Sequence, residues 1–282
     1  MHFNTKVRQI TTCPDAQDGQ RRVQLDVTTL QGGDALNTLY FDEVVVTCPL
    51  GWLKRNVDKF TPSLPPRLTQ AIDSIGYGCL EKVYISFPKA FSLSKEGDDR
   101  KIQGFVQWLS PGYASSTNPN KWTQEAVELA SLAPGDAHPT LLFYTFGAQS
   151  KHLTASVAEL KDQAERDRFL FDFFKPYYSR LPHYSESAED CKPIGCLATD
   201  WLLDELAGYG SYSNFQVGLE EGDVDVETMR HGVPDRGLWF AGEHTAPFVA
   251  LGTATGAYWS GESVARRIAE AYGRPPSQKD DQ

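Results

Sequence analysis

The stretch Leu238-Trp-Phe-Ala-Gly-Glu-His-Thr245, followed by Leu251-Gly-Thr-Ala-Thr-Gly-Ala-Tyr-Trp-Ser-Gly261, decides the fold of this chain. A short apolar segment stops at Gly242-Glu243, and a segment rich in small residues begins a few residues later. The pattern predicts a strand, a loop and a helix. A helix N-terminus presents N–H groups and a positive dipole end, and glycines let a backbone approach a ligand closely. By pattern alone, the stretch is either a plain packing unit or a cofactor site.

The composition narrows the class of protein. The 282 residues are 40% hydrophobic and 12% aromatic, which is enough for a core in one large or two modest domains. We find no apolar run of the roughly 18 residues that a membrane helix needs and no signal-peptide pattern, so we expect no membrane association. The net charge of −10 argues against a nucleic-acid partner and suits cationic substrates such as amines.

Five cysteines are scattered along the chain. Cys191 and Cys196 are too far apart for a C-x-x-C redox pair, and no histidine cluster accompanies them for zinc. We therefore expect free or buried thiols, no metal site, and an intracellular, cytoplasmic protein.

Periodicity predicts the main elements. Strands are expected at 4–10, 22–30, 39–48, 80–87, 140–146 and 194–200, and helices at 67–75, 157–174 and 255–272. Residues 125–132 fit either a strand or a helix. Loops are expected at 95–100, 115–121 and 220–225, and a disordered tail at 275–282. On the last helix, the expected buried stripe is Tyr258, Ala265, Ile268 and Tyr272.

The decisive stretch also resembles a known signature. Phe240-Ala-Gly-Glu-His-Thr245 with Gly252-Thr-Ala-Thr-Gly-Ala-Tyr-Trp-Ser-Gly261 is similar to the C-terminal FAD-binding motif of the flavin-containing amine oxidases, which include polyamine oxidases, monoamine oxidases and histone lysine demethylases. Residues 41–54 and 60–72 resemble the family's exit from the FAD domain and its entry into the substrate domain. The resemblance covers nearly the whole chain, but only the C-terminal portion of a family member.

One family motif is absent. Family members open with a strand, a Gly-x-Gly-x-x-Gly turn and a helix. The nearest candidate, Gly208-Tyr-Gly-Ser-Tyr-Ser213, lacks the third glycine. The chain therefore resembles a truncated amine oxidase. The sequence leaves open whether such a chain binds FAD or is active alone.

The resemblance implies an α/β fold (mixed α+β). It consists of a partial FAD-binding domain of the glutathione-reductase-like type and an inserted substrate domain built on a mixed β-sheet with helices. The implied boundaries are 1–61 for the first FAD segment, 62–193 for the substrate domain, and 194–274 for the second FAD segment.

Two residues gain catalytic roles from the resemblance. Lys82 lies on an alternating strand, on the same face as Leu80 and Tyr84. By pattern alone it is a solvated side chain, and by resemblance it holds a water at flavin N5 that assists reoxidation by O2. Tyr212 is similar to one aromatic of the cage around the amine. The plain alternative is a turn tyrosine beside a buried Trp201.

The resemblance also implies the cofactor contacts. Val7 meets the adenine through its main chain, and Glu243 binds the ribityl–pyrophosphate region. Thr253 and Ala254 make backbone contacts at the helix start. Thr253 also replaces the second cage aromatic of the polyamine oxidases, which makes the site closer to lysine demethylases or fungal relatives. Ser211 stands where monoamine oxidases carry the cysteine that bonds the flavin, so FAD is expected to be non-covalent.

Together these features predict an FAD-dependent oxidoreductase that oxidises the C–N bond of a polyamine or related small-molecule amine with O2 as acceptor. FAD accepts the hydride equivalent, and the protein supplies orientation and a dry pocket. Two alternatives stay open: a non-catalytic truncated paralogue acting through protein contacts, and another flavin oxidoreductase of the same superfamily. The sequence fixes neither the amine nor the oligomeric state.

Overall fold

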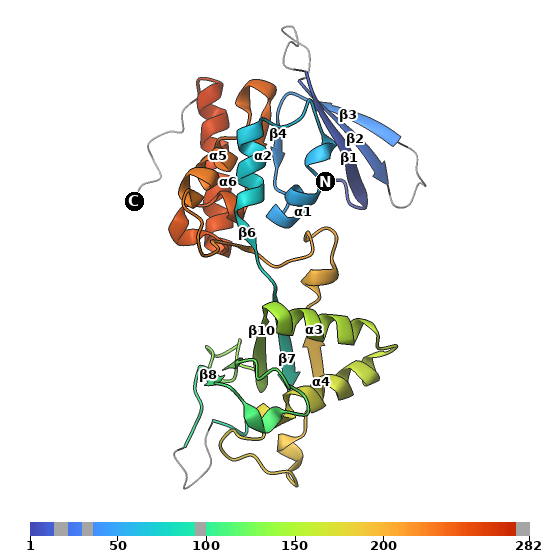
Figure 1. Cartoon of the computed structure of the whole chain (residues 1–282), viewed down its shortest axis with the longest axis vertical. Coiled ribbons are helices and arrows are strands. Elements are labelled where there is room, and N and C mark those ends of the chain that lie inside the picture. Colours follow the sequence, from blue (N-terminus) through green and yellow to red (C-terminus); the bar gives the residue numbers. More distant parts are fainter. Residues whose placement is uncertain (14–21, 30–35, 94–99, 275–282) are drawn as a thin grey trace. The chain divides into compact units, whose positions relative to one another are not determined.

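The computed structural model describes residues 1–13, 22–29, 36–93 and 100–274. The chain divides into two compact units, one made of Met1–Gly78 with Asp204–Gln282 and the other of Cys79–Leu203. We call them unit 1 and unit 2; Figure 1 shows both. Most of the segment expected as a loop at 95–100, and the tail at 275–282, lie outside the described residues.

The boundaries of the units follow the packing and differ from the expected 61/62 and 193/194. Helix α2 (Pro66–Ser74) packs against α5 (Gly222–His231) and α1 (Leu50–Arg55), which keeps residues 62–78 in unit 1. Strand β11 (Gly195–Ala198) pairs with β7 (Leu80–Ser86), which keeps residues 194–203 in unit 2.

The described residues of unit 1 form three small sheets. The first has the order β3-β2-β1-β5, formed by β1 (Thr5–Thr12), β2 (Val23–Thr29), β3 (Leu36–Phe41) and β5 (Phe60–Thr61). The others are the parallel pair β4 (Val44–Val46) with β13 (Leu238–Phe240) and the antiparallel pair β6 (Gly76–Tyr77) with β12 (Ser213–Asn214). The single strand expected over 39–48 is thus two strands in two sheets, because the chain bends at Asp42.

Helix α5 corrects the loop expected at 220–225. The helix begins at Gly222, within the acidic run. Asp223 and Asp225 lie in its first turn, where carboxylates are favoured by the helix dipole. Val226 and Met229 are buried in the core of unit 1. The acidic run is therefore a helix start rather than a solvated loop.

Helix α6 (Ala254–Ala271) forms where the sequence predicts it, but its buried stripe differs. Tyr258 and Tyr272 are 68% and 54% exposed. The buried positions are Gly256, Ser260 and Val264, spaced four residues apart. The small residues bring the helix close to the loop that follows β13. Val264 packs against Trp239 of β13 and against Ala241, which follows the strand.

Unit 2 is built on one antiparallel sheet with the order β11-β7-β10-β9-β8. Its other strands are β8 (Phe105–Trp108), β9 (Gln124–Glu128) and β10 (Thr140–Phe146). Residues 124–128 are thus a strand. The single helix expected over 157–174 is two helices, α3 (Gly147–Ala158) and α4 (Gln163–Tyr178). The break occurs because the Asp162 side chain accepts the Glu165 N–H and starts a new helix.

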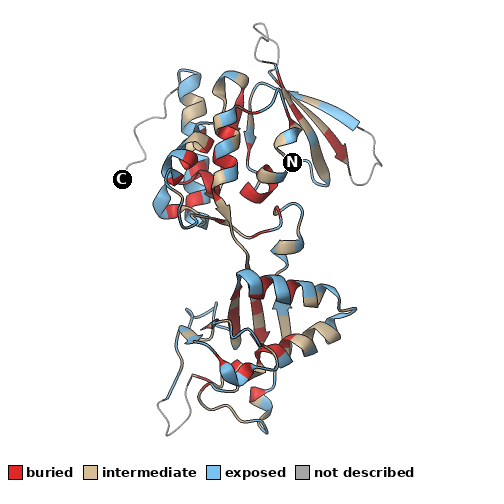
Figure 2. Cartoon of the chain, viewed as in Figure 1, coloured by how far each residue is buried: buried red, intermediate tan, exposed pale blue. Residues whose placement is uncertain are grey.

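Each unit has a hydrophobic core of its own. Figure 2 shows buried residues in each unit where helices and strands meet. Across the described part of the chain, none of the helices combines the length and apolar character needed to span a membrane. All five cysteines are described and are free thiols.

Candidate functional site

The strand–loop–helix unit lies in unit 1 as the sequence predicts. Strand β13 ends at Phe240, and a single 3-10 turn over Glu243–Thr245 follows. The Gly242 N–H donates to Ser260 Oγ on α6 at 2.8 Å, which ties the end of the strand to the helix. The loop therefore has a fixed position between the strand and the helix.

Glu243 braces this loop with both carboxylate oxygens. Its Oε1 accepts the N–H and the hydroxyl of Ser213 at 3.0 and 2.8 Å, and its Oε2 accepts the Gly252 N–H at 2.8 Å. A carboxylate offers about four acceptor positions. Three are used within the chain, so Glu243 orders the site and keeps capacity for roughly one further donor.

The start of α6 is exposed and capped. The Thr253 hydroxyl accepts the Gly256 N–H at 2.9 Å and donates to the Ala250 carbonyl at 2.7 Å. Thr253, Ala254 and Thr255 are exposed. The first turn of a helix has N–H groups without intrahelical acceptors, and together with the dipole they favour an anion there.

Tyr212 lies against the turn that leads into α6. Gly252 has φ +74°, and a Cβ at this position would come within 2.8 Å of Tyr212 Cδ2. The backbone of Tyr212 is fixed by the Gly78 N–H, which donates to its carbonyl at 2.7 Å. Ser211 donates its hydroxyl to the Gly78 carbonyl at 3.0 Å. The structure thus brings together Glu243, Tyr212 and the helix start at Thr253.

Burial shapes the electrostatics of this region. Burial lowers the pKa of His244 to about 4, and its Nε2 has no hydrogen-bond partner among the described residues. His244 is therefore neutral at neutral pH. Burial, with the nearby Glu243 carboxylate, raises the pKa of Tyr77 to about 12. Its hydroxyl stays protonated and donates to the Ala207 carbonyl at 2.7 Å.

Two further predicted site residues belong to other structural elements. Val7 is on β1, opposite Val27 on β2, and so belongs to a different sheet from β13. Lys82 is on β7 of unit 2. Trp201, expected to be buried, is 45% exposed and also belongs to unit 2.

Lys82 occupies the face of β7 that the sequence predicts. The buried positions of β7 are Glu81, Val83 and Ile85, whereas Lys82 and its neighbours two residues away are half-buried. Lys82 pairs with Tyr144 on β10, and its Nζ lies 5.7 Å from the centroid of that ring. Lys82 therefore has an aromatic neighbour that periodicity alone could not identify.

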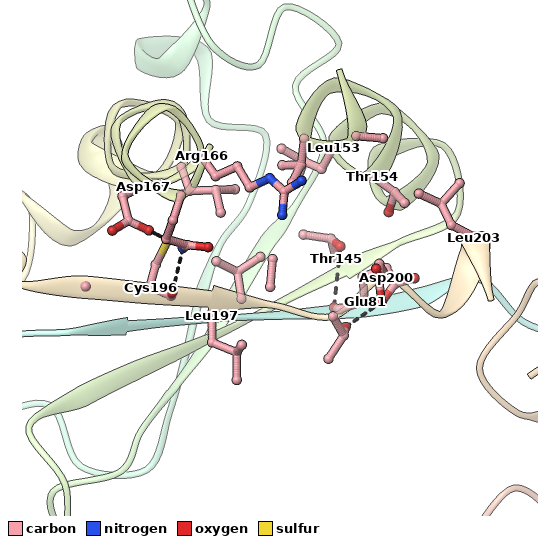
Figure 3. Close-up of a pocket in the computed structure, with 18 residues that line it drawn as sticks. Glu81, Thr145, Leu153, Thr154, Arg166, Asp167, Cys196, Leu197, Asp200 and Leu203 are labelled. Carbon is pink, nitrogen blue, oxygen red and sulfur yellow. Dashed lines mark hydrogen bonds between the residues drawn. The ribbon is translucent and has the colours of Figure 1, made fainter. Parts of the chain in front are cut away.

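The opposite face of this sheet lines a cavity of about 600 Å³ beneath α3 and α4 (Figure 3). Arg166 projects into the cavity, and the Cys196 thiol donates to Asp167 Oδ1 at 3.1 Å. Burial and Asp167 raise the pKa of Cys196 to about 12, so the thiol is unreactive. Glu81 lines this cavity and Lys82 does not. The cavity is thus separate from the predicted catalytic lysine.

Comparison with known proteins identifies the family of this chain. The family described as flavin containing amine oxidoreductase matches residues 1–269. The chain is 26% identical over 236 residues to lysine-specific histone demethylase 1 of Caenorhabditis elegans, covering 81% of this chain and 27% of that protein. It is 32% identical over 234 residues to lysine-specific histone demethylase 1 homolog 2 of Arabidopsis thaliana (80% and 26%). It is 29% identical over 251 residues to polyamine oxidase 2 of Arabidopsis thaliana (88% and 43%).

This chain belongs to the flavin containing amine oxidoreductase family. Its mixed α/β fold is consistent with the FAD-binding fold of that family. The chain spans less than half the length of these curated relatives.

The described residues fit part of a flavin cofactor. An exposed, capped helix start and a carboxylate with spare acceptor capacity suit a phosphate and a hydroxylated chain. The sequence reasoning missed Ser213 and Gly252 as the partners of Glu243. No sequence motif predicts these hydrogen bonds, because Ser213 and Glu243 lie 30 residues apart in the chain.

Proposed function

We propose that this chain carries the flavin-end and substrate portions of an enzyme that oxidises the C–N bond of an amine, with O2 as the electron acceptor. The observation that carries the proposal is the exposed start of α6, capped by Thr253 and held beside Tyr212 through Glu243 and Gly252. FAD, bound non-covalently, supplies the redox chemistry. A small-molecule amine and O2 are the partners in this proposal.

Each residue near α6 has a binding role in the proposal. The Ala254 N–H and the dipole of an 18-residue helix attract a phosphate. The Thr253 N–H donates to the Ala250 carbonyl at 3.2 Å, so Thr253 contributes through the cap and the close approach of its backbone. The remaining acceptor capacity of Glu243 takes a ribityl hydroxyl. Ser211 offers no thiol for a covalent link, so acid precipitation should release the flavin into the supernatant.

The catalytic roles rest on family membership. Tyr212 provides an aromatic wall for the amine, because ring faces attract cations and also accept a neutral amine. Lys82 holds a water that assists reoxidation by O2, and the main chain of Val7 meets the adenine. The substrate is a polyamine or a methylated lysine side chain, the two amine classes that the names of the relatives indicate.

Binding of FAD, FMN and riboflavin to the full chain tests the helix-start contact. If the chain binds chiefly the flavin and its first phosphate, FAD and FMN should bind within tenfold of each other, and riboflavin more weakly. Ala254→Pro removes one N–H at a position where proline suits a helix. It should weaken FMN binding about tenfold and leave riboflavin unchanged.

Ala254→Ser is the matched control, since it keeps the N–H, and should bind FMN like the wild type. Flavin fluorescence titration measures all three ligands. Equal FMN affinity in wild type and Ala254→Pro would contradict the helix-start contact. With flavin in excess, hydrogen peroxide release from spermine or from a methyl-lysine peptide tests the amine chemistry.

One observation favours a second candidate, a non-catalytic chain that acts through protein contacts. Phe248, Val249 and Tyr258 are 68%, 83% and 68% exposed around the start of α6. Exposed apolar groups of this kind often mark protein interfaces. A dimer that forms without flavin in sedimentation velocity, together with no peroxide release from a flavin-saturated chain, would support this candidate instead.

A further inference from the structure

Three arginines from three helices of unit 1 line one pocket of about 620 Å³. Arg67 comes from α2, Arg230 from α5 and Arg267 from α6. The residues described above as the candidate flavin site do not line this pocket. The pocket therefore needs an explanation of its own.

Each guanidinium group is held in place by at least one contact. Arg67 Nη1 pairs with Asp225 at 2.6 Å, and Arg230 Nε donates to the Thr245 carbonyl at 2.7 Å. Arg267 Nη1 donates to the His231 carbonyl at 3.3 Å. The Arg267 group also lies 5.5 Å from the centroid of the Trp239 ring. The cations are thus pre-organised, which lowers the entropic cost of binding a ligand.

The same groups have N–H donors that the fold leaves unused. Arg67 Nη2, Arg267 Nε and Arg267 Nη2 are buried and have no hydrogen-bond partner within the described part of the chain. Buried donors without acceptors are rare, because each loses its hydration without compensation. Only five side-chain atoms among the described residues are in this state. Three of them belong to this one pocket.

The charge balance of the pocket favours an anion. Glu227 is the one carboxylate among its lining residues, against three guanidinium groups. Asp225 lies behind Arg67 and is already bonded to Arg67 and to Ser74. Burial and the neighbouring Arg230 lower the pKa of Arg267, as expected for a cation crowded by another cation. This cationic site belongs to a chain of net charge −10.

We propose that this pocket binds a small polyanion that carries two or more phosphoryl or carboxylate groups. Guanidinium groups present planar pairs of donors that match the oxygens of either group. Three such groups can engage more than one anionic centre at once, and a rotation of the Arg67 and Arg267 side chains toward the ligand would give their unused N–H donors an acceptor. The proposal does not depend on flavin binding or on amine oxidation.

Isothermal titration of the full chain with inorganic pyrophosphate and, separately, with citrate tests the proposal at constant ionic strength in a chloride buffer. We expect one site for at least one of these anions. Arg67→Met and Arg267→Met should each weaken binding about tenfold or more. Arg266→Met is the matched control, since Arg266 is the exposed neighbour on the same helix and does not line the pocket. It should bind like the wild type.

The two probes distinguish the sources of the anion. Binding of pyrophosphate alone would identify a phosphorylated ligand, and binding of citrate alone a polycarboxylate; both results support the site. Circular dichroism checks that each variant is folded, and Arg67→Lys provides a milder second variant that should retain part of the affinity. Absence of binding by both anions at millimolar concentration, or equal losses in Arg266→Met and Arg267→Met, would overturn the proposal.

Discussion

The two units of this chain are organised on opposite principles. Unit 2 is one contiguous segment of the chain, built on a single five-stranded antiparallel sheet. Unit 1 joins segments from both ends of the chain, and its candidate site depends on a few hydrogen bonds between a loop, a turn and a helix start. A residue in unit 2 is thus supported by a continuous sheet, whereas the site in unit 1 depends on single side chains. Substitutions should therefore have their largest effects in unit 1.

Glu243→Ala should have the largest effect on stability. The change removes three hydrogen bonds and leaves the N–H groups of Ser213 and Gly252 without their acceptor. We expect a loss of about 3–5 kcal/mol. Hydrogen exchange by mass spectrometry should show faster exchange in unit 1 and unchanged exchange in unit 2. Glu262→Ala, at an exposed position of α6, is the control. An equal effect of this substitution would contradict the stabilising role of the Glu243 hydrogen bonds.

Acidification should also destabilise unit 1. His244 has an unfolded pKa of about 6.5 and a folded pKa of about 4. The unfolded state therefore binds the proton first, so the stability is fully present above pH 6.5 and is lost as the pH falls toward 4. The loss should reach about 3 kcal/mol at pH 4.

Urea unfolding between pH 7 and pH 4 measures this dependence. His244→Gln cannot titrate and should show a shallower loss over the same range. An identical pH profile for the wild type and the variant would show that His244 does not carry the effect.

Thr253→Ala should have a moderate effect. The variant loses the cap that accepts the Gly256 N–H, which costs about 1 kcal/mol. Its Tm should fall by a few degrees, and FMN binding should weaken because the helix start frays. Thr255→Ala removes a neighbouring exposed threonine that is not the cap, and should leave the Tm unchanged.

Lys82→Met should have the smallest effect on stability, about 0.5–1 kcal/mol, from the lost contact with the Tyr144 ring. In a protein completed with a dinucleotide-binding half, it should slow flavin reoxidation sharply while FAD stays bound. Stopped-flow flavin absorbance measures both half-reactions. Wild-type rates in both would remove Lys82 from the mechanism.

The sequence predicts local features well and distant ones poorly. The strand over 140–146, the face of Lys82 and the strand–loop–helix unit were all read from short-range periodicity. The two-helix split at Asp162 was missed because one amphipathic pattern runs across the break. The start of α5 was missed because an acidic run suits a loop and a helix N-terminus equally.

The candidate site was predicted in part. Family resemblance pointed to Glu243, Tyr212 and Thr253, and the structure places them around one turn. Their roles in catalysis and cofactor binding stay predictions. The arginine pocket could not be foreseen, because its three guanidinium groups come from helices separated by up to 200 residues. Neither the periodicity of the sequence nor the spacing of its residues predicts that these three side chains lie in one pocket.

The parallel pair of β4 and β13 has a consequence for the order of folding during synthesis. Val44 pairs with Leu238, so β4 cannot form its pair with β13 until the whole of unit 2 has been translated. At about 5–20 residues per second, that delay lasts roughly ten seconds or more. Unit 2 is contiguous in sequence, so all of its strands are translated before β13 and it can fold within this interval. The nascent chain should therefore expose the β4 segment to chaperones until the C-terminal residues emerge.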